Sequence, residues 1–399
     1  MKTIIIGAGA AGLTAAYFAA KAGQTVIILE KTDKAGKKIL MSGGTRCNVL
    51  PVVMNLDDFF TNASPNLLKK VFKSWSLNAC KTWLEEEVGI PLATETESNK
   101  WFPTSNSAKE VRDKLLDACL ELGVTIKYNQ HVRELIQGET KWIAKTELQE
   151  WQADKIILST GGKSIPSTGT EGEGFRILKN LGHSLVEPFA ALTPLKGAHP
   201  FEQGLQGISL NVELSVSALG QKSQSNRSGF LFTHDGFSGP AVLDPSHYAV
   251  LHQLGRIEKP DFRVNWASKK RDDWDLHLQS GRGTVLNRLK EWLPARLAES
   301  LCAECNLNAR NCSELRREER LNLLEKLVSY PLEVSGNEGY RKAEVTGGGV
   351  PLEEINTGNM ESKILPGLYL CGELVDVFGR IGGFNFYWAW VSGRLAGKG

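Results

Sequence analysis

The first thirty residues constrain the fold of this chain more than any other stretch. A short apolar run over 2–6 is followed at once by the glycine-rich segment 7–12, which reads Gly-Ala-Gly-Ala-Ala-Gly. The pattern then predicts a helix over 13–22, a second strand over 24–29 and an acidic residue, Glu30. A strand, a glycine turn, a helix, a strand and an acid in this order are typical of a dinucleotide-binding βαβ unit.

Each part of this unit has a physical role in holding a dinucleotide. Gly7 permits the tight turn, Gly9 lets the backbone approach a pyrophosphate, and Gly12 lets the helix pack closely on the strand. The first N–H groups of the helix and the positive end of its dipole attract the phosphates. Glu30 can accept hydrogen bonds from a ribose.

The uncharged stretch 3–20 could also be compared with a signal peptide or a membrane segment. Three glycines within six residues make a poor membrane helix, and the isoleucines at 4–6 suit a buried parallel strand. The other bulk properties agree with a soluble protein: 399 residues, 41% hydrophobic and 23% charged. We therefore expect neither export nor membrane insertion.

Charge and cysteine content limit the partners and the compartment. The net charge of +2 gives no electrostatic reason to expect nucleic acid or a membrane surface as a partner. The seven cysteines are scattered and odd in number, which favours the reducing cytoplasm over a disulfide framework. Cys302, Cys305 and Cys312 lack a fourth ligand of suitable spacing, so we expect no metal site.

The segment 42–48, Ser-Gly-Gly-Thr-Arg-Cys-Asn, is too small and polar for a helix or strand. Such a loop can approach a ligand and offers it backbone N–H groups and one fixed cation, Arg46. The alternative is a surface loop with an incidental arginine.

The middle of the first domain repeats the opening arrangement. A buried strand over 155–158 ends in the small residues Ser159 to Gly162, so backbone can approach a ligand a second time. Helices are predicted over 66–88, 108–122 and 175–181, a strand over 124–128 and a small hairpin over 141–153. The strand at 124–128 should return His131, Val132 and Arg133 towards the nucleotide. His183 is interpreted as a capping or core histidine.

The composition changes near residue 193, and an inserted β-barrel-like domain is expected over 193–282. Strict alternation over 208–216 predicts a half-buried antiparallel strand, and 230–233 and 275–278 are interpreted in the same way. The polar turn 233–240 contains His234 and could face a ligand, although an isolated histidine is more often structural. A helical subdomain is expected over 283–340, with helices over 284–301 and from a cap at Ser313 to 328.

The C-terminal segment suggests the identity of the cofactor. A strand over 367–371 ends in Gly372 and Glu373, and glycines at 379, 382 and 383 precede Asn385 and a helix through 393. A second acid and a second helix N-terminus suit the far end of a long cofactor. A nicotinamide cofactor would not need them, whereas FAD would, because a helix dipole stabilises the negative charge of a reduced flavin ring.

These segments together resemble a flavoprotein family of aminoacetone oxidase-like and 3-dehydro-bile-acid reductase-like enzymes, nearly from end to end. Further marks of the resemblance are Phe102-Pro103, the segment 160–164, Gly182-His183, the turn 232–240 and the segment 360–363. The resemblance implies an α/β fold with a Rossmann-type FAD-binding domain, made of 1–192 and 341–399, around the two inserted parts. The chain departs from the family pattern at Thr45, Trp101, Ile381 and Tyr387, and bulky Tyr387, Trp388 and Trp390 could reshape the substrate pocket.

Motifs and resemblance together predict non-covalent FAD and a set of contacts to it. The predicted cofactor-binding residues are Gly7, Gly9, Ala10, Ala11, Gly12, Glu30, Lys31, Ser42, Gly43, Arg46, Asn48, Val132, Thr160, Gly161, Gly162, Gly372, Glu373, Gly382, Gly383, Phe384 and Asn385. Arg46 and His234 are the candidate substrate-binding residues, and no catalytic acid or base is assigned.

The predicted function is an FAD-dependent oxidoreductase that exchanges a hydride between flavin N5 and a small organic substrate. No second glycine-rich nucleotide motif is present for a resident NAD(P)H, which could still reduce the flavin as a transient visitor. The alternatives are a flavin-dependent nucleic-acid-modifying enzyme and a non-catalytic flavin sensor or partner-binding protein. Substrate identity and oligomeric state are left open.

Overall fold

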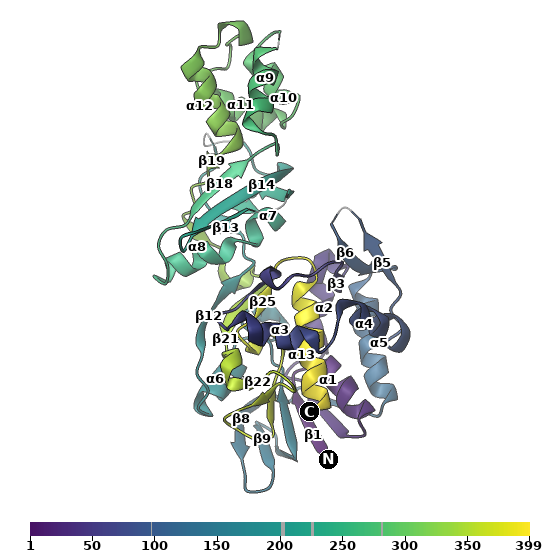
Figure 1. The fold of residues 1–399 in the computed structure, drawn as a ribbon. Helices are drawn as coiled ribbons and strands as arrows, with labels where there is room; N and C mark the ends of the chain where they lie inside the picture. The colour runs from purple at the N-terminus through teal and green to yellow at the C-terminus, as the bar shows by residue number, and fades with distance from the viewer. Residues whose placement is uncertain (97, 201–203, 225–226, 281) are drawn as a thin grey trace. The chain divides into compact units, whose positions relative to one another are not determined.

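The computed structural model describes residues 1–96, 98–200, 204–224, 227–280 and 282–399 (Figure 1). The chain divides into two compact units. Unit 1 contains Met1–Ala190 and Glu344–Gly399, and unit 2 contains Ala191–Ala343. Each unit has its own cluster of buried apolar side chains. Unit 1 is therefore assembled from both ends of the chain, drawn in purple and yellow in Figure 1.

The central sheet of unit 1 has the strand order β22-β23-β24-β11-β1-β2-β7. Its strands are β1 Lys2–Ile6, β2 Thr25–Leu29, β7 Thr125–Lys127, β11 Lys155–Leu158, β22 Ile355–Asn356, β23 Glu361–Ser362 and β24 Leu368–Leu370. β1 pairs in parallel with β2 and with β11, and β11 pairs in parallel with β24. Isoleucine-rich strands that are buried on both faces are expected in such a sheet. The predicted strands and the Rossmann-type α/β class are confirmed.

Two helices from opposite ends of the chain pack against each other in unit 1. The helices of this unit are α1 Ala10–Lys21, α2 Lys37–Met41, α3 Pro65–Lys73, α4 Leu77–Thr82, α5 Ala108–Glu121, α6 Glu173–Asn180 and α13 Phe384–Lys398. A Cβ atom at Gly393 of α13 would lie 2.5 Å from the carbonyl oxygen of Ala11, and one at Gly397 would lie 2.4 Å from that of Ala15. The two glycines therefore let α13 approach the backbone of α1 directly.

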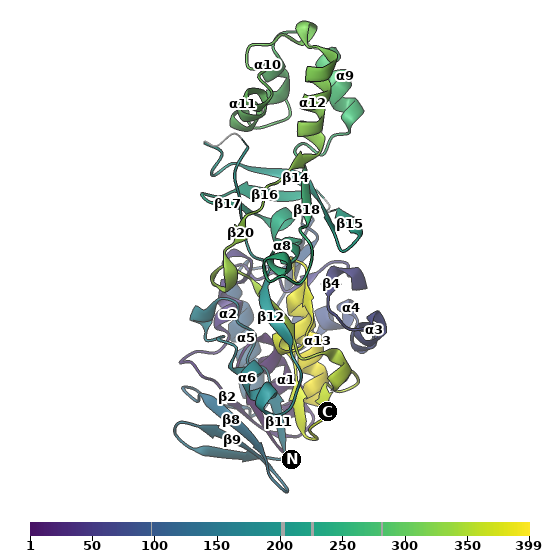
Figure 2. The ribbon, with the colours of Figure 1, turned by 90° about the vertical axis from the view of Figure 1, so that its left-hand side faces the viewer.

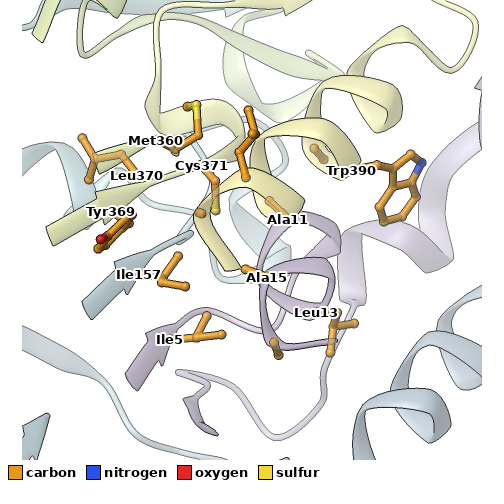
Figure 3. Close-up of a cluster of buried hydrophobic side chains, with 14 of the residues drawn as sticks. Ile5, Ala11, Leu13, Ala15, Ile157, Met360, Tyr369, Leu370, Cys371 and Trp390 are labelled. Atoms are coloured by element: carbon orange, nitrogen blue, oxygen red, sulfur yellow. The ribbon is translucent and has the colours of Figure 1, made fainter. Parts of the chain in front are cut away.

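Apolar side chains from sheet and helices meet beneath this helix pair. Figure 3 shows Ile5 and Ile157 of the sheet, Leu13 of α1 and Trp390 of α13 among these residues, all with no exposed surface. This core joins the first and the last element of the chain, so the position of α13 depends on the N-terminal βαβ unit.

Besides the pair of β12 Val186–Ala191 and β21 Val345–Gly349, small antiparallel layers flank the central sheet of unit 1. They are formed by β8 Val132–Gln137, β9 Trp142–Thr146 and β10 Glu150–Ala153, by β3 Leu50–Pro51, β5 Leu92–Glu95 and β6 Lys100–Pro103, and by β4 Phe59–Phe60 with β25 Phe378–Gly379. Figure 1 shows the β8–β9 hairpin on one side of β1, with α1 and α13 on the other. The predicted hairpin at 141–153 is confirmed and gains β8 as a third strand.

The single helix predicted over 66–88 is wrong. The segment forms α3, then α4, and then one π-helical turn over Trp83–Glu87. α3 ends at Lys73, and the hydroxyl of Ser76 accepts a hydrogen bond from Ala79 N at 3.2 Å and so caps a new helix. The apolar residues are spaced as in a helix throughout 66–88, so their spacing gives no sign that the helix is interrupted between Lys73 and Leu77.

His183 lies in the core of unit 1, which confirms its interpretation as a core histidine. Its Nδ1 is 2.6 Å from the Glu354 carboxylate, and its Nε2 is 2.9 Å from the Ser362 hydroxyl. This order of serine, histidine and acid resembles a catalytic triad. However, Ser362 is buried, and its Oγ also accepts hydrogen bonds from the backbone N–H groups of Ile364 and Leu365. The hydroxyl therefore stabilises a turn.

Lys155 provides a prediction about stability and pH. Its Nζ donates a 2.6 Å hydrogen bond to Ala396 O and lies 4.0 Å above the Tyr369 ring. Burial lowers the pKa of Lys155 to about 8. Between this value and the ordinary lysine pKa, the unfolded chain binds a proton that the folded chain does not, so stability should rise with pH across that interval. Urea unfolding of wild type and Lys155→Met at several pH values measures this, because the variant should lose the rise. An identical pH dependence in both proteins would show that Lys155 does not titrate in this way.

Unit 2 is built around one antiparallel sheet. Its strands are β13 Leu195–Lys196, β14 Ser209–Ala218, β15 Gln221–Gln224, β16 Ser228–Phe232, β17 Gly236–Ser238, β18 Asp261–Asn265, β19 Tyr330–Pro331 and β20 Gly336–Asn337. Their order is β19-β18-β14-β16-β17-β13-β20, with β15 paired to β14. Among the described residues β19 and β20 do not pair with each other, so a closed barrel is not present there. The strands predicted at 208–216 and 230–233 are confirmed.

The strand predicted over 275–278 is wrong. These residues lie in α9 Arg271–Gln279, one of a group of helices with α10 Val285–Lys290, α11 Ala295–Glu304 and α12 Arg317–Val328 (Figure 2). Trp274 and Leu278 are buried four residues apart, whereas Leu276 is exposed. Over this short stretch the leucines alternate as they would in a strand, so the helical spacing of the buried residues was not recognised.

Two further helix boundaries differ from expectation. The helix predicted over 284–301 is divided into α10 and α11, with Pro294 immediately before α11. Ser313 lies in a 3-10 turn, and α12 begins at Arg317. The buried cluster of unit 2 contains side chains from both the sheet and these helices. The division of this region into separate domains at 193–282 and 283–340 stays a prediction, as do the boundaries 1–192 and 341–399.

The cysteines at 302, 305 and 312 are free thiols. Across the described ranges, no three His, Cys, Asp or Glu side chains are grouped so that they could hold a metal ion. Across the same ranges, no helix combines the length and the apolar character needed to span a bilayer.

Candidate active site

A cavity in unit 1 lies where the carboxyl ends of β1, β2 and β11 meet the N-terminal ends of α1 and α13. It is lined by residues from the glycine turn after β1, from the turn after β11 and from the approach to α13. Ligands of open parallel sheets bind at this edge, where the loops that follow the strands converge.

The glycine turn after β1 is shaped in three different ways by its three glycines. Gly7 has a φ of 100° and would place a Cβ 2.7 Å from Ser159 O, so the turn needs glycine there. A Cβ at Gly12 would lie 2.0 Å from Gly7 O, inside the contact of α1 with the turn. A Cβ at Gly9 would have no atom within 4 Å. Gly9 lines the cavity, so this open space is where a ligand can approach the backbone.

Glu30 supports the same turn from the end of β2. One carboxylate oxygen accepts a hydrogen bond from Ala8 N at 2.8 Å, and the other accepts from the backbone N–H and hydroxyl of Thr32, each at 2.8 Å. Glu30 also lines the cavity. Each carboxylate oxygen has more than one lone pair, so Glu30 can still accept from a ribose hydroxyl.

Ion pairs bridge the wall of the cavity beside Glu30. Lys31 contacts Glu171 at 2.5 Å and Glu173 at 3.1 Å, and His131 also contacts Glu173. Burial opposes the charged form of Lys31, but hydrogen bonds to the two glutamates outweigh it and raise the pKa of Lys31. These residues tie the end of β2 to the start of β8 and the start of α6.

A lysine and a glutamate form the polar middle of the cavity. Lys38 Nζ donates to Glu373 at 2.5 Å and to the hydroxyl of Ser164 at 2.5 Å. The second oxygen of Glu373 accepts from Thr346 N at 3.3 Å. Both Lys38 and Glu373 line the cavity, so a cation and an acceptor stand side by side there.

The far end of the cavity is the N-terminus of α13. Gly383 is the N-cap residue with a φ of 92°, and no side chain caps the helix. A Cβ at Gly383 would lie 2.6 Å from the backbone of Leu50, which brings β3, just after the 42–48 loop, to this end. The side chain of Asn385 fixes the approach by accepting from Gly379 N at 2.8 Å and donating to Gly379 O at 2.9 Å. The uncapped N–H groups and the helix dipole favour negative charge here.

The cavity fits FAD in its chemistry. Two helix N-termini, α1 and α13, border it and suit the two negative regions of a reduced flavin dinucleotide. Two lining residues carry side-chain oxygens that are buried and have no partner among the described residues, Gln130 Oε1 and Thr160 Oγ1. Such atoms normally gain a partner, and the polar groups of a dinucleotide can supply one.

Most of the predicted cofactor-binding residues line this one cavity. They are Gly7, Gly9, Ala10, Ala11, Glu30, Lys31, Ser42, Gly43, Asn48, Val132, Thr160, Gly161, Gly372, Glu373, Gly382, Gly383 and Asn385. Gly12, Gly162 and Phe384 do not line it, and at the two glycines the neighbouring segments approach too closely for a Cβ atom. A Cβ at Gly162, for example, would lie 2.2 Å from the Thr346 hydroxyl.

Arg46 does not line the cavity. Its guanidinium pairs with Glu95 at 2.8 Å, donates to Asn106 at 2.9 Å and lies 4.2 Å above the Phe102 ring. The backbone around it, at Ser42, Gly43 and Asn48, does line the cavity. The loop therefore reaches the site while its cation is engaged by the β5–β6 hairpin.

His234 belongs to unit 2. It lies exposed in the turn between β16 and β17. Its assignment to the substrate stays a prediction.

The bulky residues of α13 that were expected at the pocket are core residues. Tyr387 donates to Trp75 O at 2.6 Å, Trp388 to Gly372 O at 3.0 Å and Trp390 to Val49 O at 3.0 Å. None of the three lines the cavity, whereas Ile381 and Phe386 do. The tryptophans hold Gly372 and Val49 in place.

Sequence reasoning missed several residues of the cavity. Lys38, Gln130 and the segment 168–173 line it without having been assigned to it, whereas His131 lines it as expected from the strand at 124–128. The segment 168–173 carried a signal in its glycines and acids, since Gly169 and Gly172 have φ values of 98° and 85°. Nothing in the sequence indicated that Lys38 lines the cavity, because a lysine in a polar loop is usually solvated.

Comparison with known proteins identifies the family. The model of the family described as HI0933-like protein Rossmann domain matches residues 1–399. The chain belongs to the HI0933-like family. As a member of this family of FAD-dependent oxidoreductases, it is an FAD-binding enzyme, and the cavity of unit 1 carries the family's glycine turns.

Two relatives match this chain over nearly their full lengths. A protein named ribosomal RNA dihydrouridine synthase, from Escherichia coli strain K12, is 31% identical over 98% of this chain and 95% of the relative. A protein named 3-dehydro-bile acid delta(4,6)-reductase, from Clostridium scindens, is 29% identical over 99% of this chain and 97% of the relative. The structure of 3-ketosteroid delta1-dehydrogenase from Sterolibacterium denitrificans covers 99% of this chain and 98% of its own, with a TM-score of 0.52 and 14% identity. That likeness concerns the fold alone.

Proposed function

We propose that this chain reduces a carbon–carbon double bond that is conjugated to a carbonyl group, with FAD as the hydride carrier. The names of the two relatives support this proposal. Formation of dihydrouridine and the action of a delta(4,6)-reductase both saturate a double bond in such a conjugated system. The substrates in the two names are unrelated, so the shared reaction is the best guide to this chain.

The chain's own residues would prepare the cavity for this reaction. When bound, FAD supplies hydride transfer at its N5 atom. Gly9 and the N-terminus of α1 would bind its pyrophosphate, and Glu30 and Glu373 would accept hydrogen bonds from its hydroxyl groups. The uncapped N-terminus of α13 would stabilise negative charge at the far end. The protein would further orient the substrate relative to FAD and exclude water from the cavity.

The first candidate substrate is a small unsaturated carbonyl compound. The relative named for a bile acid supports it, and so does the net charge of +2, which offers no general attraction to polyanions. NAD(P)H would reduce the flavin as a transient visitor, because the chain has one GxGxxG segment near its start and no second unit of that kind.

The second candidate substrate is a uracil base in ribosomal RNA. The relative named ribosomal RNA dihydrouridine synthase, at 31% identity over the full length, favours it. An RNA substrate would require local positive charge, since the chain as a whole carries little.

Anaerobic spectroscopy tests the proposal. The purified protein is reduced with NADH or NADPH under argon, and the return of oxidised flavin absorbance is followed after addition of substrate. A steroid 3-oxo-4,6-diene or cyclohexenone should reoxidise the flavin if the first candidate is right, and a ribosomal RNA transcript should do so if the second is right. Free FAD at the same concentration, reduced photochemically, is the control. If none of these compounds accelerates reoxidation beyond the control, the reductase proposal is wrong.

A further inference from the structure

A lysine from the β5–β6 hairpin packs beside a glycine at the far end of the cavity. Lys100 is the first residue of β6 and pairs with Glu95 of β5 and with Pro51 of β3. Its side chain extends over Gly382, because a Cβ built on that glycine would lie 3.1 Å from Lys100 Cε and 3.8 Å from Lys100 Cδ. Gly382 lines the cavity between Ile381 and Gly383. Lys100 is not itself among the residues that line the cavity, but its side chain packs beside Gly382, which does line it, next to the N-terminus of α13.

Lys100 differs from the other cation of this region in its partners. Arg46 is engaged by Glu95, Asn106 and the Phe102 ring. The side chain of Lys100 has no hydrogen bond and no ion pair with any residue in the described ranges. The hydrogen bonds of Ser98 and Arg46 hold the pKa of Glu95 below its usual value, and the charge of Lys100 adds to this effect. Glu95 is thus already satisfied by other groups, and Lys100 keeps its donors free.

Two lysines that line the cavity are already engaged, unlike Lys34, which also lines it and whose side chain has no hydrogen bond or ion pair among the described residues. Lys38 is held by Glu373 and Ser164, and Lys31 is held by Glu171 and Glu173. An anionic group at the α13 end would find one cation with unused donors, Lys100, and the uncapped helix N-terminus.

We propose that Lys100 binds an anionic oxygen of the substrate, a carboxylate or a phosphate, at the α13 end of the cavity. This inference rests on the proposed function, because it assigns a substrate contact to that reaction. It transfers to Lys100 the role that the sequence suggested for Arg46. Lys100 is a residue that positions the substrate, and no step of bond making is assigned to it.

The first test measures the local charge and does not depend on the reaction. The fluorescence of bound FAD is quenched with iodide, an anion, and with acrylamide, which is neutral. Lys100→Met should lower the ratio of the iodide to the acrylamide quenching constant roughly two-fold, because a cation near the ring concentrates iodide there. Lys100→Arg should keep the ratio of the wild type. Lys109→Met is the matched control, since Lys109 lies on α5 with a side chain that is 73% exposed.

An equal ratio in wild type and Lys100→Met, with normal FAD content in both, would overturn the inference. Normal FAD content also excludes a folding defect as the reason for any change.

The second test compares charged and neutral substrates in steady-state kinetics. In Lys100→Met, KM should rise roughly ten-fold for a carboxylated cyclohexenone or for uridine monophosphate, with kcat little changed. KM for the methyl ester or for uridine should stay at the wild-type value. A rise for the carboxylate pair alone identifies a carboxylate, and a rise for the nucleotide pair alone identifies a phosphate. An equal rise for charged and neutral compounds would contradict the assignment. If no compound is reduced by the wild type, the proposed function fails, and the quenching test still decides the position of Lys100.

Discussion

Gly9→Val is expected to abolish FAD binding while the protein stays folded. The valine side chain would enter space in which no atom lies within 4 Å of its Cβ, and the φ of −80° at this position suits any L-residue. The same space is where the backbone must approach the pyrophosphate. Titration of the apoprotein with FAD, followed by flavin fluorescence, should show a Kd raised by at least about 100-fold, a loss of roughly 3 kcal/mol.

Gly12→Val is the informative companion to this variant. Its Cβ would lie 2.0 Å from Gly7 O, so the substitution forces α1 away from the turn. We expect loss of the folded protein itself, seen by circular dichroism as a lower melting temperature or as no cooperative transition. If Gly9→Val bound FAD normally, the phosphates would lie elsewhere and the assignment of the cavity would be wrong.

Gly393→Ala and Gly397→Ala are expected to destabilise unit 1, although alanine normally stabilises a helix. The intrinsic preference for alanine in a helix interior is about 1 kcal/mol. The added Cβ atoms would lie 2.5 and 2.4 Å from carbonyl oxygens of α1, and overpacking of this kind costs about 1–3 kcal/mol. The overpacking should therefore lower the free energy of unfolding by more than the helix propensity of alanine raises it. The net loss should be larger in the double variant.

Urea unfolding with and without FAD measures this effect. FAD affinity should fall as well, because α13 carries the far end of the cavity at its N-terminus. Lys398→Ala in the last turn of α13 is the control, and it should change the free energy of unfolding by less than about 0.5 kcal/mol because it is exposed. A gain in stability in both glycine variants would show that the α1–α13 contact relaxes easily.

The sequence was sufficient for the parts of the site that depend on local structure. Gly7, Gly9 and Glu30 belong to one βαβ unit, and the spacing within that unit determines where they lie. Gly372 and Gly383 were recognised for the same reason, because each follows a strand or precedes a helix in a short segment.

Contacts between remote segments could not be predicted in this way. Arg46 was placed at the ligand because its own loop offers no partner, but Glu95, 49 residues later, supplies one. Lys100 was overlooked because its relation to Gly382 exists only after the β5–β6 hairpin and the approach to α13 are brought together. The strand expected at 275–278 failed for a local reason, since four residues are too few to separate a period of two from a helical period.

The discontinuity of unit 1 has a consequence for synthesis on the ribosome. Unit 2 is one continuous segment, Ala191–Ala343, with its own buried cluster. It can collapse as soon as it emerges, whereas unit 1 must wait until β24 and α13, which follow unit 2 in the chain, have been synthesised. Until then the edge of β11 that β24 will cover and the face of α1 that α13 will cover remain open. These surfaces stay exposed until α13 has been synthesised, and the cavity cannot be completed for the cofactor before that point.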